Sequence, residues 1–301
     1  MVGGLKQEER GADVDVLNKL GKSSIRATDV AAQYWCERQM ELNYTYGPKI
    51  TKEIKKGRAM HEGMENEVNV PIVLMPKSYP DFLYKSLYTS TMALEALFKN
   101  GKAREIQIYG AISGFKLVGK VDLLELHDDE VTVVEDKTKA NDNMPSEPQL
   151  LTHKVQVMLY RSILEKLRSK RYSIEDFRKV YKPAFMRITP EFSRQLDALA
   201  IEKDMQSVDA IAVKLFDEFA RIKRISDNLR IRYINQFTGK EIGVHRFVYN
   251  EDELNSMMEF SLKYWRGERE SLPVPESEKW KCNYCAFFGK ECKVWWPQKG
   301  L

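Results

Sequence analysis

Two runs of aliphatic and β-branched residues near the middle of the chain predict a hairpin. The runs span residues 116–126 and 131–137, and the His-Asp-Asp sequence at 127–129 between them is typical of a tight turn. A similar run at 105–110 predicts another strand, so we expect a sheet of at least three strands. The second run of the hairpin ends in polar residues, where a buried strand would be expected to stay apolar.

The rest of the chain shows mostly helical periodicity interrupted by turn-forming stretches. Apolar residues at helical spacing predict a helix from Thr28 and further helices over 51–69, 89–100, 149–168, 190–224 and 251–265. Strand-like patterns predict a strand over 181–188 and a second hairpin over 230–249, turned at Thr238, Gly239 and Lys240. We expect a flexible arm over 1–24 and irregular segments over 71–85 and 141–148.

Composition describes a soluble globular protein. The 301 residues are 43% hydrophobic and 31% charged, which is enough for a substantial core. The net charge of +4 permits binding to nucleic acid without requiring it. No apolar run approaches the roughly 20 residues that cross a bilayer, and the acidic first residues differ from a secretion signal. We therefore expect an intracellular protein, cytoplasmic in a prokaryote or archaeon and nuclear or mitochondrial in a eukaryote.

Polar residues of the predicted hairpin can converge on one point. Asp122 lies in the first strand, and strand alternation places Glu135 and Lys137 on one face of the second. Carboxylates at such a point can hold Mg²⁺ or Mn²⁺ for phosphodiester hydrolysis, and a nearby lysine can hold or deprotonate the attacking water, or stabilise negative charge. Taken alone, an acid and a lysine two residues apart are more typical of a solvated strand face.

Two predicted helices carry polar residues in helical register. Gly57, His61 and Glu65 lie four residues apart and share one face, and Gln156 and Tyr160 lie four apart on a later helix. His61 could add an imidazole ligand, which would favour tolerance of Mn²⁺. Taken alone, each of these groups is also common on an ordinary helix surface.

The four cysteines are spaced for metal binding. Cys282, Cys285 and Cys292 lie close together near the C-terminus, and Cys36 lies in the first long helix. Without a secretion signal, metal ligation fits better than disulfides. An iron–sulfur cluster and a zinc ion both accept four cysteines, and one C-x2-C pair with two single cysteines suits the cluster somewhat better. Free buried thiols are the remaining alternative.

In their order along the chain, these residues resemble a known nuclease family. The residues that carry the resemblance are Gly57, His61 and Glu65, then Gly119 and Asp122, then Glu135, Asp136 and Lys137, then Gln156 and Tyr160. This motif set is similar to that of the RecB-like branch of the PD-(D/E)xK nucleases, and the cysteines look like its iron–sulfur version. Over about residues 25 to 295 the chain resembles the exonuclease V family. Asp136 is a departure, because this position is often apolar in relatives.

The resemblance implies an architecture. The fold would be α/β (α+β) with a PD-(D/E)xK restriction-endonuclease-like core, a mixed central sheet flanked by helices, and helical additions. One RecB-like nuclease domain would span 25–301 after the flexible arm of 1–24. An iron–sulfur subdomain would be formed by Cys36 and residues 280–295, with a [4Fe-4S] cluster on Cys36, Cys282, Cys285 and Cys292 that staples the N- and C-terminal regions.

The resemblance also implies a Mg²⁺- or Mn²⁺-dependent exonuclease that degrades single-stranded DNA, commonly 5′ to 3′, releasing short oligonucleotides in repair or replication. The implied catalytic residues are Asp122, Glu135, Lys137, Gln156 and Tyr160, and the implied metal ligands are His61, Asp122, Glu135 and Asp136. The implied partners are single-stranded DNA and a single-strand DNA-binding protein. The enzyme would be a monomer and would not bind a membrane. The alternatives are a CRISPR-adaptation-type processing nuclease or endonuclease with the same core, and a non-catalytic DNA-binding iron–sulfur protein.

Basic and aromatic residues supply candidate DNA contacts. Basic residues occur in two stretches, one with Lys52, Lys55, Lys56 and Arg58, the other with Arg221, Lys223, Arg224, Arg230 and Arg232. Candidate base-stacking residues are Tyr84, Tyr88, Trp280 and Tyr284, while Trp35, Trp295 and Trp296 could either touch DNA or shield the cysteines. A solvated face is the commoner explanation for a charge run.

Overall fold

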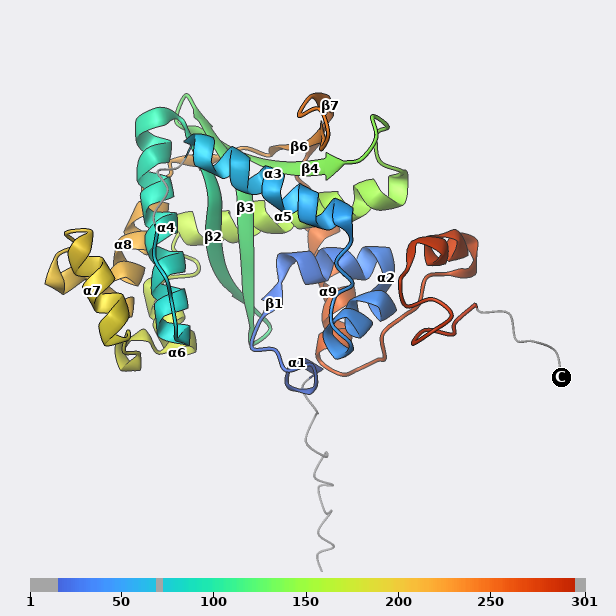
Figure 1. The fold of residues 1–301 in the computed structure, drawn as a ribbon, viewed down its shortest axis with the longest axis horizontal. Coiled ribbons are helices and arrows are strands. Elements are labelled where there is room, and N and C mark those ends of the chain that lie inside the picture. The colour runs from blue at the N-terminus through green and yellow to red at the C-terminus, as the bar shows by residue number, and fades with distance from the viewer. Residues whose placement is uncertain (1–15, 69–72, 296–301) are drawn as a thin grey trace, which may run out of the picture.

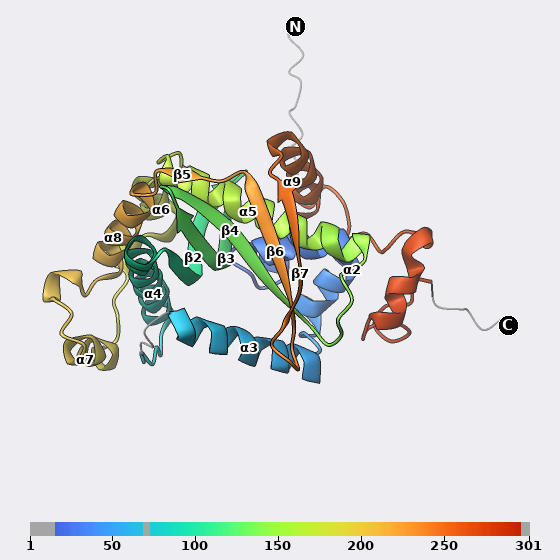
Figure 2. The same ribbon diagram turned by 90° about the horizontal axis from the view of Figure 1, so that it is seen from above.

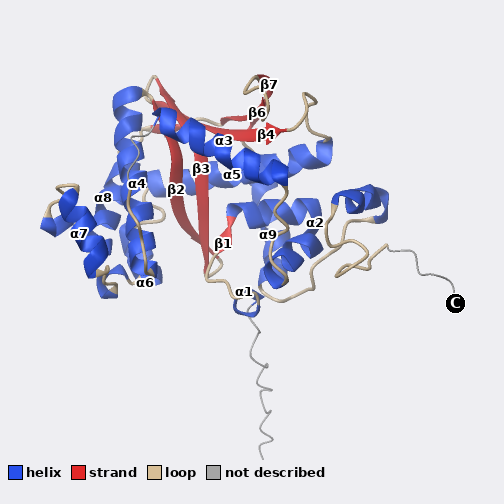
Figure 3. Ribbon diagram, in the orientation of Figure 1, coloured by secondary structure: helices blue, strands red, loops and turns tan. Residues whose placement is uncertain are grey.

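A twisted mixed sheet lies at the centre of the molecule, with helices on both faces (Figures 1 and 3). A computed structural model describes residues 16–68 and 73–295 of the chain. The strands of the described sheet are β1 (Ile25–Arg26), β2 (Lys102–Ile112), β3 (Phe115–His127), β4 (Glu130–Lys139), β5 (Arg224–Ile225), β6 (Asn228–Asn235) and β7 (Glu241–Val248). The path through the sheet runs β1-β3-β4-β6-β7, with β2 on β3 and β5 on β4.

The predicted hairpin is confirmed as β3 and β4. Its turn falls at Asp128 and Asp129, which both adopt positive φ, as two-residue turns between twisted strands require. The antiparallel pairing is short, because it joins only residues 123–127 of β3 to 130–134 of β4. Beyond that point the two strands separate, and residues 134–139 of β4 pair in parallel with β6. The hairpin therefore opens into a fork at Asp122.

Helices cover both faces of this fork. The described helices are α1 (Val16–Lys19), α2 (Ala27–Thr45), α3 (Lys52–Val68), α4 (Tyr79–Asn100), α5 (Glu147–Arg168), α6 (Ile174–Tyr181), α7 (Pro190–Ala198), α8 (Val208–Ala220) and α9 (Glu251–Trp265). Figure 2 shows α3 and α5 on opposite sides of the sheet. One continuous apolar core joins the elements from Leu17 to Trp265. No helix among the described residues is long and apolar enough to cross a membrane.

Several predicted elements differ from the structure. The predicted strand over 181–188 is wrong: α6 ends at Tyr181, Lys182 takes a left-handed conformation, and a 3-10 turn follows over Pro183–Phe185. Pro183 follows the left-handed Lys182 and has no backbone N–H to donate to a sheet, so the chain turns here and does not continue as a strand. The single helix predicted over 190–224 is instead α7, the 3-10 turn Lys203–Met205 and α8.

Two boundaries also move. The segment predicted to be irregular over 71–85 contains the first residues of α4, which is capped by Ser78 and Asp81 and begins at Tyr79. The predicted arm is too long, because residues 16–19 form α1 and Leu17 is buried in the core. The remainder of the arm, residues 1–15, lies outside the described residues.

Candidate active site

The candidate site lies at the fork between β3 and β4. Asp122 is the last residue of β3 before its pairing with β4 begins at Leu123. The backbone N–H of Asp136 donates a hydrogen bond of 2.9 Å to Asp122 Oδ2 and so spans the fork. Glu135, on the neighbouring position of β4, is 2% exposed and lines the same groove as Asp122. The two predicted carboxylates are therefore brought together.

Lys137 is held by a network that begins on β4 and ends on α5. Its Nζ donates to Glu135 Oε1 at 2.7 Å and to Gln156 Oε1 at 2.9 Å. The amide nitrogen of Gln156 donates to Glu135 Oε1 at 2.7 Å and to Tyr160 Oη at 2.8 Å. Since Gln156 and Tyr160 lie one helical turn apart, α5 positions both residues toward the sheet. Gln156 therefore contacts Lys137 directly, and Tyr160 is linked to Lys137 through Gln156.

Two glycines of the motif set allow these elements to approach closely. A Cβ at Gly119 would lie 2.7 Å from Cε1 of Tyr160, so the absence of a side chain on β3 lets the Tyr160 ring pack there. A Cβ at Gly57 would lie 2.7 Å from Oγ1 of Thr138, so α3 can pass directly over β4. The glycines therefore set the depth at which both helices sit on the sheet.

The electrostatics of the site are dominated by buried carboxylates. Burial, together with the charge of Glu135, raises the pKa of Asp122 well above its ordinary value, and burial also raises the pKa of Glu135. Burial alone would lower the pKa of Lys137, but the attraction of Glu135 and Asp122 outweighs it and raises that pKa. Burial raises the pKa of Tyr160 strongly, so its hydroxyl is neutral. A divalent cation beside Asp122 and Glu135 would relieve their mutual repulsion.

The donor set of the fork fits a hard divalent cation. Among the described residues, Glu135 Oε2 is buried and has no hydrogen-bond partner, so one carboxylate oxygen is free to serve as a ligand. His61 on α3 lies nearby, with Nδ1 at 3.9 Å from Asp122 Oδ2. Carboxylate oxygens suit Mg²⁺ and Mn²⁺, and an added imidazole extends the choice toward Mn²⁺.

One member of the predicted metal set is wrongly assigned. The carboxylate of Asp136 points away from the fork and pairs with Arg104 at 2.7 Å and with Arg232 at 2.7 and 2.8 Å. Burial would raise the pKa of Asp136, but these guanidinium groups outweigh it and lower that pKa. Because both oxygens are engaged by arginines, the side chain of Asp136 is a structural anion and not a metal ligand.

Glu105 joins the site, although no prediction included it. It lies on β2 opposite Asp122, and its Oε1 is 3.8 Å from Nδ1 of His61. Its other oxygen pairs with Lys120. The only sequence signal was an acid at the first position of the predicted strand 105–110, and such a position is usually solvated. Its approach to Asp122 depends on the β2–β3 register, which the sequence does not specify.

Several basic residues predicted to contact DNA pair with other residues of the protein. Arg230 donates to Glu125 at 2.8 Å and Arg232 is held by Asp136, so both guanidinium groups are engaged within the sheet. Lys223 and Arg224 contact the β3–β4 turn, and Arg221 pairs with Glu218. The prediction of Arg230 and Arg232 as DNA-binding residues is therefore not supported by their contacts.

Other predicted contacts remain on the surface. Lys55 and Arg58 are exposed on α3, and Arg58 lines the groove that contains Asp122 and Glu135. Tyr84 is fully buried in the core, so the prediction that it stacks on bases is wrong. Tyr88 is half-buried and stacks on Tyr84. Trp280 and Tyr284 are exposed near the C-terminus, and Trp296 lies outside the described residues.

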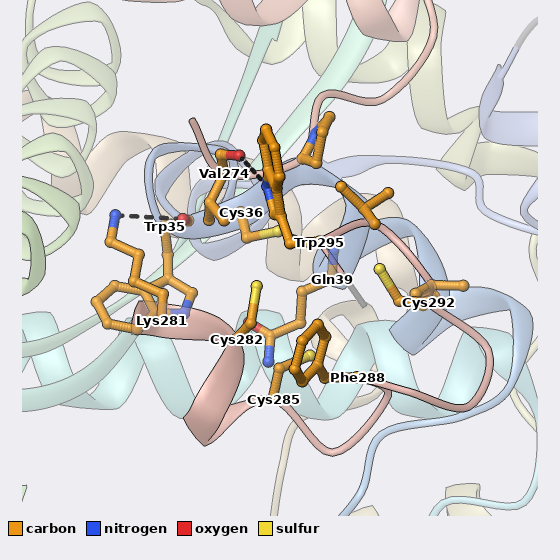
Figure 4. A pocket seen from close by; sticks show the side chains of 13 residues that line it. Trp35, Cys36, Gln39, Val274, Lys281, Cys282, Cys285, Phe288, Cys292 and Trp295 are labelled. Carbon is orange, nitrogen blue, oxygen red and sulfur yellow. Dashed lines mark hydrogen bonds between the residues drawn. The ribbon is translucent and has the colours of Figure 1, made fainter. Parts of the chain in front are cut away.

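The four cysteines face one cavity between α2 and the C-terminal segment (Figure 4). Backbone angles that depart from helical values at Cys36 kink α2 and present this residue to the C-terminal segment. Trp35, Phe288 and Trp295 line the same cavity, and Trp295 donates its indole N–H to the carbonyl of Val274 at 3.0 Å. Burial raises the pKa of the Cys36 and Cys282 thiols.

The cysteine sulfurs lie farther apart than the ligands of a single zinc ion would. A zinc ion with sulfur ligands at about 2.3 Å would bring the sulfurs to within about 4 Å of one another. Within the described part of the chain, no three of these sulfur atoms lie within 4.8 Å of one another. A cluster holds its cysteine ligands farther apart because several iron atoms lie between them. Among residues 16–68 and 73–295, those that line the cavity include no carboxylate or imidazole.

Comparisons with known proteins point to one family. The family model described as "Exonuclease V - a 5' deoxyribonuclease" matches residues 14–132, 125–214 and 203–296. A protein named Exonuclease V from Danio rerio is 22% identical over 290 residues, covering 90% of this chain and 70% of the relative. A protein named "Exonuclease V, mitochondrial" from Komagataella phaffii is 27% identical over 115 residues, covering 38% of this chain and 20% of the relative. The solved structure of SSO0001 aligns with a TM-score of 0.43 and 14% identity, covering 88% of this chain and 84% of the other.

Proposed function

The chain belongs to the exonuclease V family, and from this premise we propose that it degrades single-stranded DNA from a free 5′ end with the help of divalent metal ions. The observation that carries the proposal is the buried group of Asp122, Glu135 and Lys137 at the β3–β4 fork, which opens onto a groove beneath α3. Two buried carboxylates can hold a divalent ion for phosphodiester hydrolysis, and a lysine bonded to one of them can supply positive charge beside it.

Asp122 and Glu135 would hold the divalent ion, with His61 beside them. When bound, Mg²⁺ or Mn²⁺ supplies charge neutralisation for the phosphodiester and activates water for attack. Asp122 is oriented for this role by the N–H of Asp136. Glu135 is fixed through its Oε1 by Lys137 and Gln156, and its buried Oε2 has no partner among the described residues.

Lys137 acts as a cation in this arrangement. The attraction of Glu135 and Asp122 raises the pKa of Lys137, and its ammonium group donates hydrogen bonds to Glu135 and Gln156. Its ammonium group can orient the attacking water and stabilise the negative charge that develops on the phosphoryl oxygens. Gln156 holds the ammonium group in place from α5, and Tyr160 in turn fixes Gln156 as a neutral hydroxyl. Positioning of this kind keeps the lysine oriented as the transition state forms.

The groove beneath α3 supplies a route for one strand of DNA. Arg58 and Lys120 line it together with the carboxylates, so positive charge is available for phosphates on both sides of the fork. The [4Fe-4S] cluster that the four cysteines fit would staple α2 to the C-terminal segment, at a distance from the reaction. Its proposed role is structural.

Digestion of end-labelled DNA tests the proposal. The protein is purified without oxygen and given Mg²⁺ with linear single strands labelled at either end, a duplex of the same sequence, and a circular single strand. We expect the linear single strands to be degraded, short oligonucleotides to appear first from the 5′ end, and the circle to stay intact. A chelator should stop the reaction.

Two results would contradict the proposal in different ways. Cleavage of the circle at a rate similar to that of the linear strand would indicate an endonuclease with the same core. Degradation that is equally fast in the presence of a chelator would mean that the carboxylates at the fork do not act through a metal.

A further inference from the structure

A cleft beside the active site has the chemistry of a nucleotide-binding surface. It lies between α4 and the β2–β3 pair and has a volume of about 390 Å³. We propose that this cleft binds one base and the adjoining phosphate of the DNA strand that is cut at the fork, with Phe82 stacking on the base. This inference rests on the proposed function, because it extends the path of the same strand beyond the fork.

The cleft is continuous with the groove that contains Asp122, because Glu105 and Lys120 line both of them. At this border, Glu105 Oε2 pairs with Lys120, and Glu105 Oε1 lies 3.8 Å from Nδ1 of His61. A carboxylate that is paired in this way repels the phosphates of a passing strand less than an unpaired one would. A strand bound at the fork can therefore continue into the cleft.

One face of α4 forms a wall of the cleft. The α4 residues on this wall are Phe82, Lys85, Ser86, Thr89 and Ser90. Their spacing of i, i+3, i+4, i+7 and i+8 places them on a single face of the helix. Another side of α4 is apolar and is buried in the core, where it contributes Leu83, Leu87 and Leu94. The helix therefore presents a polar face to the cleft, with one phenylalanine at its start.

Phe82 is the aromatic residue of this polar face. It is 58% exposed, although its neighbours Leu83 and Tyr84 are buried in the core. A base that covers the phenyl ring would remove apolar surface from water, which is favourable. Every base has a π face, so stacking on an aromatic ring is possible with DNA of any sequence. Phe82 therefore gives the cleft a way to hold a base without reading its identity.

The charged groups around Phe82 favour a phosphate. Lys85 and Lys120 both line the cleft, whereas Glu105 is the only carboxylate among the described residues that line it. Nζ of Lys85 donates a hydrogen bond of 2.8 Å to the carbonyl of Leu74, and the side chain of Lys120 is 52% exposed. An ammonium group has three N–H bonds, so each lysine can also donate to a phosphate oxygen. Positive charge and an aromatic ring together are the features that bind single-stranded DNA without sequence preference.

Two strands that differ only in their bases test this inference through binding, independently of cleavage. One is a short oligothymidylate, and the other has the same length and the same phosphates but is abasic throughout. The dissociation constants of both strands for the full chain, purified without oxygen, are measured by fluorescence anisotropy in the presence of a chelator. We expect Phe82→Ala to weaken binding of the oligothymidylate about tenfold, because one stacked base is lost. Binding of the abasic strand should stay within about twofold of the wild type.

Two further variants distinguish stacking from a general effect on the fold. Phe82→Tyr keeps an aromatic ring and should bind both strands as the wild type does. Phe185→Ala is the matched control, because Phe185 is 84% exposed, lies on the 3-10 turn after α6 and does not line the cleft. This variant should also bind both strands with the affinity of the wild type.

The outcomes separate this inference from the proposed function. Equal binding of the oligothymidylate by the wild type and Phe82→Ala would overturn the inference, as would a wild type that binds neither strand. An equal loss for both strands, a similar loss in Phe185→Ala, or weak binding by Phe82→Tyr would overturn it as well, because stacking would not be the cause. Degradation of linear DNA by the wild type would still support the proposed function in these cases. The expected binding pattern in a wild type that degrades no DNA would support the cleft and contradict the proposed function.

Discussion

Asp136 shows how one side chain in the motif can serve the structure while its neighbours serve the chemistry. Strand alternation turns it to the opposite face from Glu135 and Lys137, where Arg104 and Arg232 enclose its carboxylate. Its backbone N–H still orients Asp122 across the fork. The residue therefore acts on the site through its main chain and on the fold through its side chain.

Replacing Asp136 with asparagine should destabilise the fold. The change removes the negative charge that two arginines share in the sheet, and loss of one member of a buried ion network costs about 3–5 kcal/mol in the free energy of unfolding. Urea denaturation measures this loss in the free energy of unfolding. Asp129→Asn is the matched control, because Asp129 pairs with Lys223 on the surface, and its loss should cost less than about 1 kcal/mol.

The stability difference between the wild type and the same variant should depend on pH. Because the folded protein lowers the pKa of Asp136, the stabilisation is complete above the unfolded value of about 3.9 and is lost as the pH falls through the lower folded value. The difference in stability between wild type and Asp136→Asn should therefore be constant near neutral pH and shrink below about pH 4. An unchanged difference at low pH would contradict the pairing.

At the residue scale, the sequence identified residues with strong local motifs and missed those that depend on register. Asp122, Glu135 and Lys137 were predictable because strand alternation and the short hairpin bring them together. Glu105 was not, since its approach to Asp122 depends on how β2 pairs with β3. Arg232 was misjudged for a related reason, because its partner Asp136 comes from a parallel neighbour far away in the sequence.

At the scale of elements, the hairpin and most helices followed from periodicity, while α6 and the start of α4 did not. The capping residues Ser173 and Ser78 decide where these helices begin, and composition alone obscures such signals. Close packing between elements also cannot be predicted from the periodicity of the sequence. The approach of Tyr160 to Gly119 can be interpreted only once β3 and α5 are placed against each other.

The kinked helix α2 and the C-terminal segment form one unit. Glu37, next to Cys36, accepts hydrogen bonds from Arg269 and from the backbone N–H of Leu272, and the N–H of Arg38 donates to the carbonyl of Leu272. Figure 1 shows the C-terminal segment beside α2. These contacts bring Cys36 toward the other cysteines, and the proposed cluster would lock the arrangement.

Replacing Cys36 with serine should remove the cluster and loosen this unit. Wild-type protein purified without oxygen should be brown, with broad absorption near about 400 nm, as expected for a cysteine-bound iron–sulfur cluster. Cys36→Ser should lose that absorption and become sensitive to proteases within residues 276–295. Tyr284→Phe is the control, because Tyr284 is an exposed residue between Cys282 and Cys285. This variant should keep the absorption of the wild type. A colourless wild-type protein with one zinc per chain would contradict the cluster.

At the scale of the whole molecule, two candidate centres lie in different parts of the fold. The fork beneath α3 gathers charged groups from β2, β3 and β4, whereas the cysteine cavity joins α2 to the C-terminal segment. The mixed sheet flanked by helices was predictable through the resemblance to a family, since the sequence patterns alone located strands without specifying their order. The parallel pairing of β4 with β6 is the long-range feature that opens the fork.

The most direct test of the central claim is the rate of DNA degradation by Lys137→Ala. This variant removes the ammonium group that Glu135 and Gln156 hold at the fork, and the loss of such a preorganised donor should lower kcat about 10²–10³-fold. Lys116→Ala is the matched control, because Lys116 lies at the far end of β3 over the ring of Tyr181. We predict Mg²⁺-dependent degradation of linear single-stranded DNA by the wild type and by Lys116→Ala, and its near-complete loss in folded Lys137→Ala. Degradation by Lys137→Ala at the wild-type rate would contradict the account.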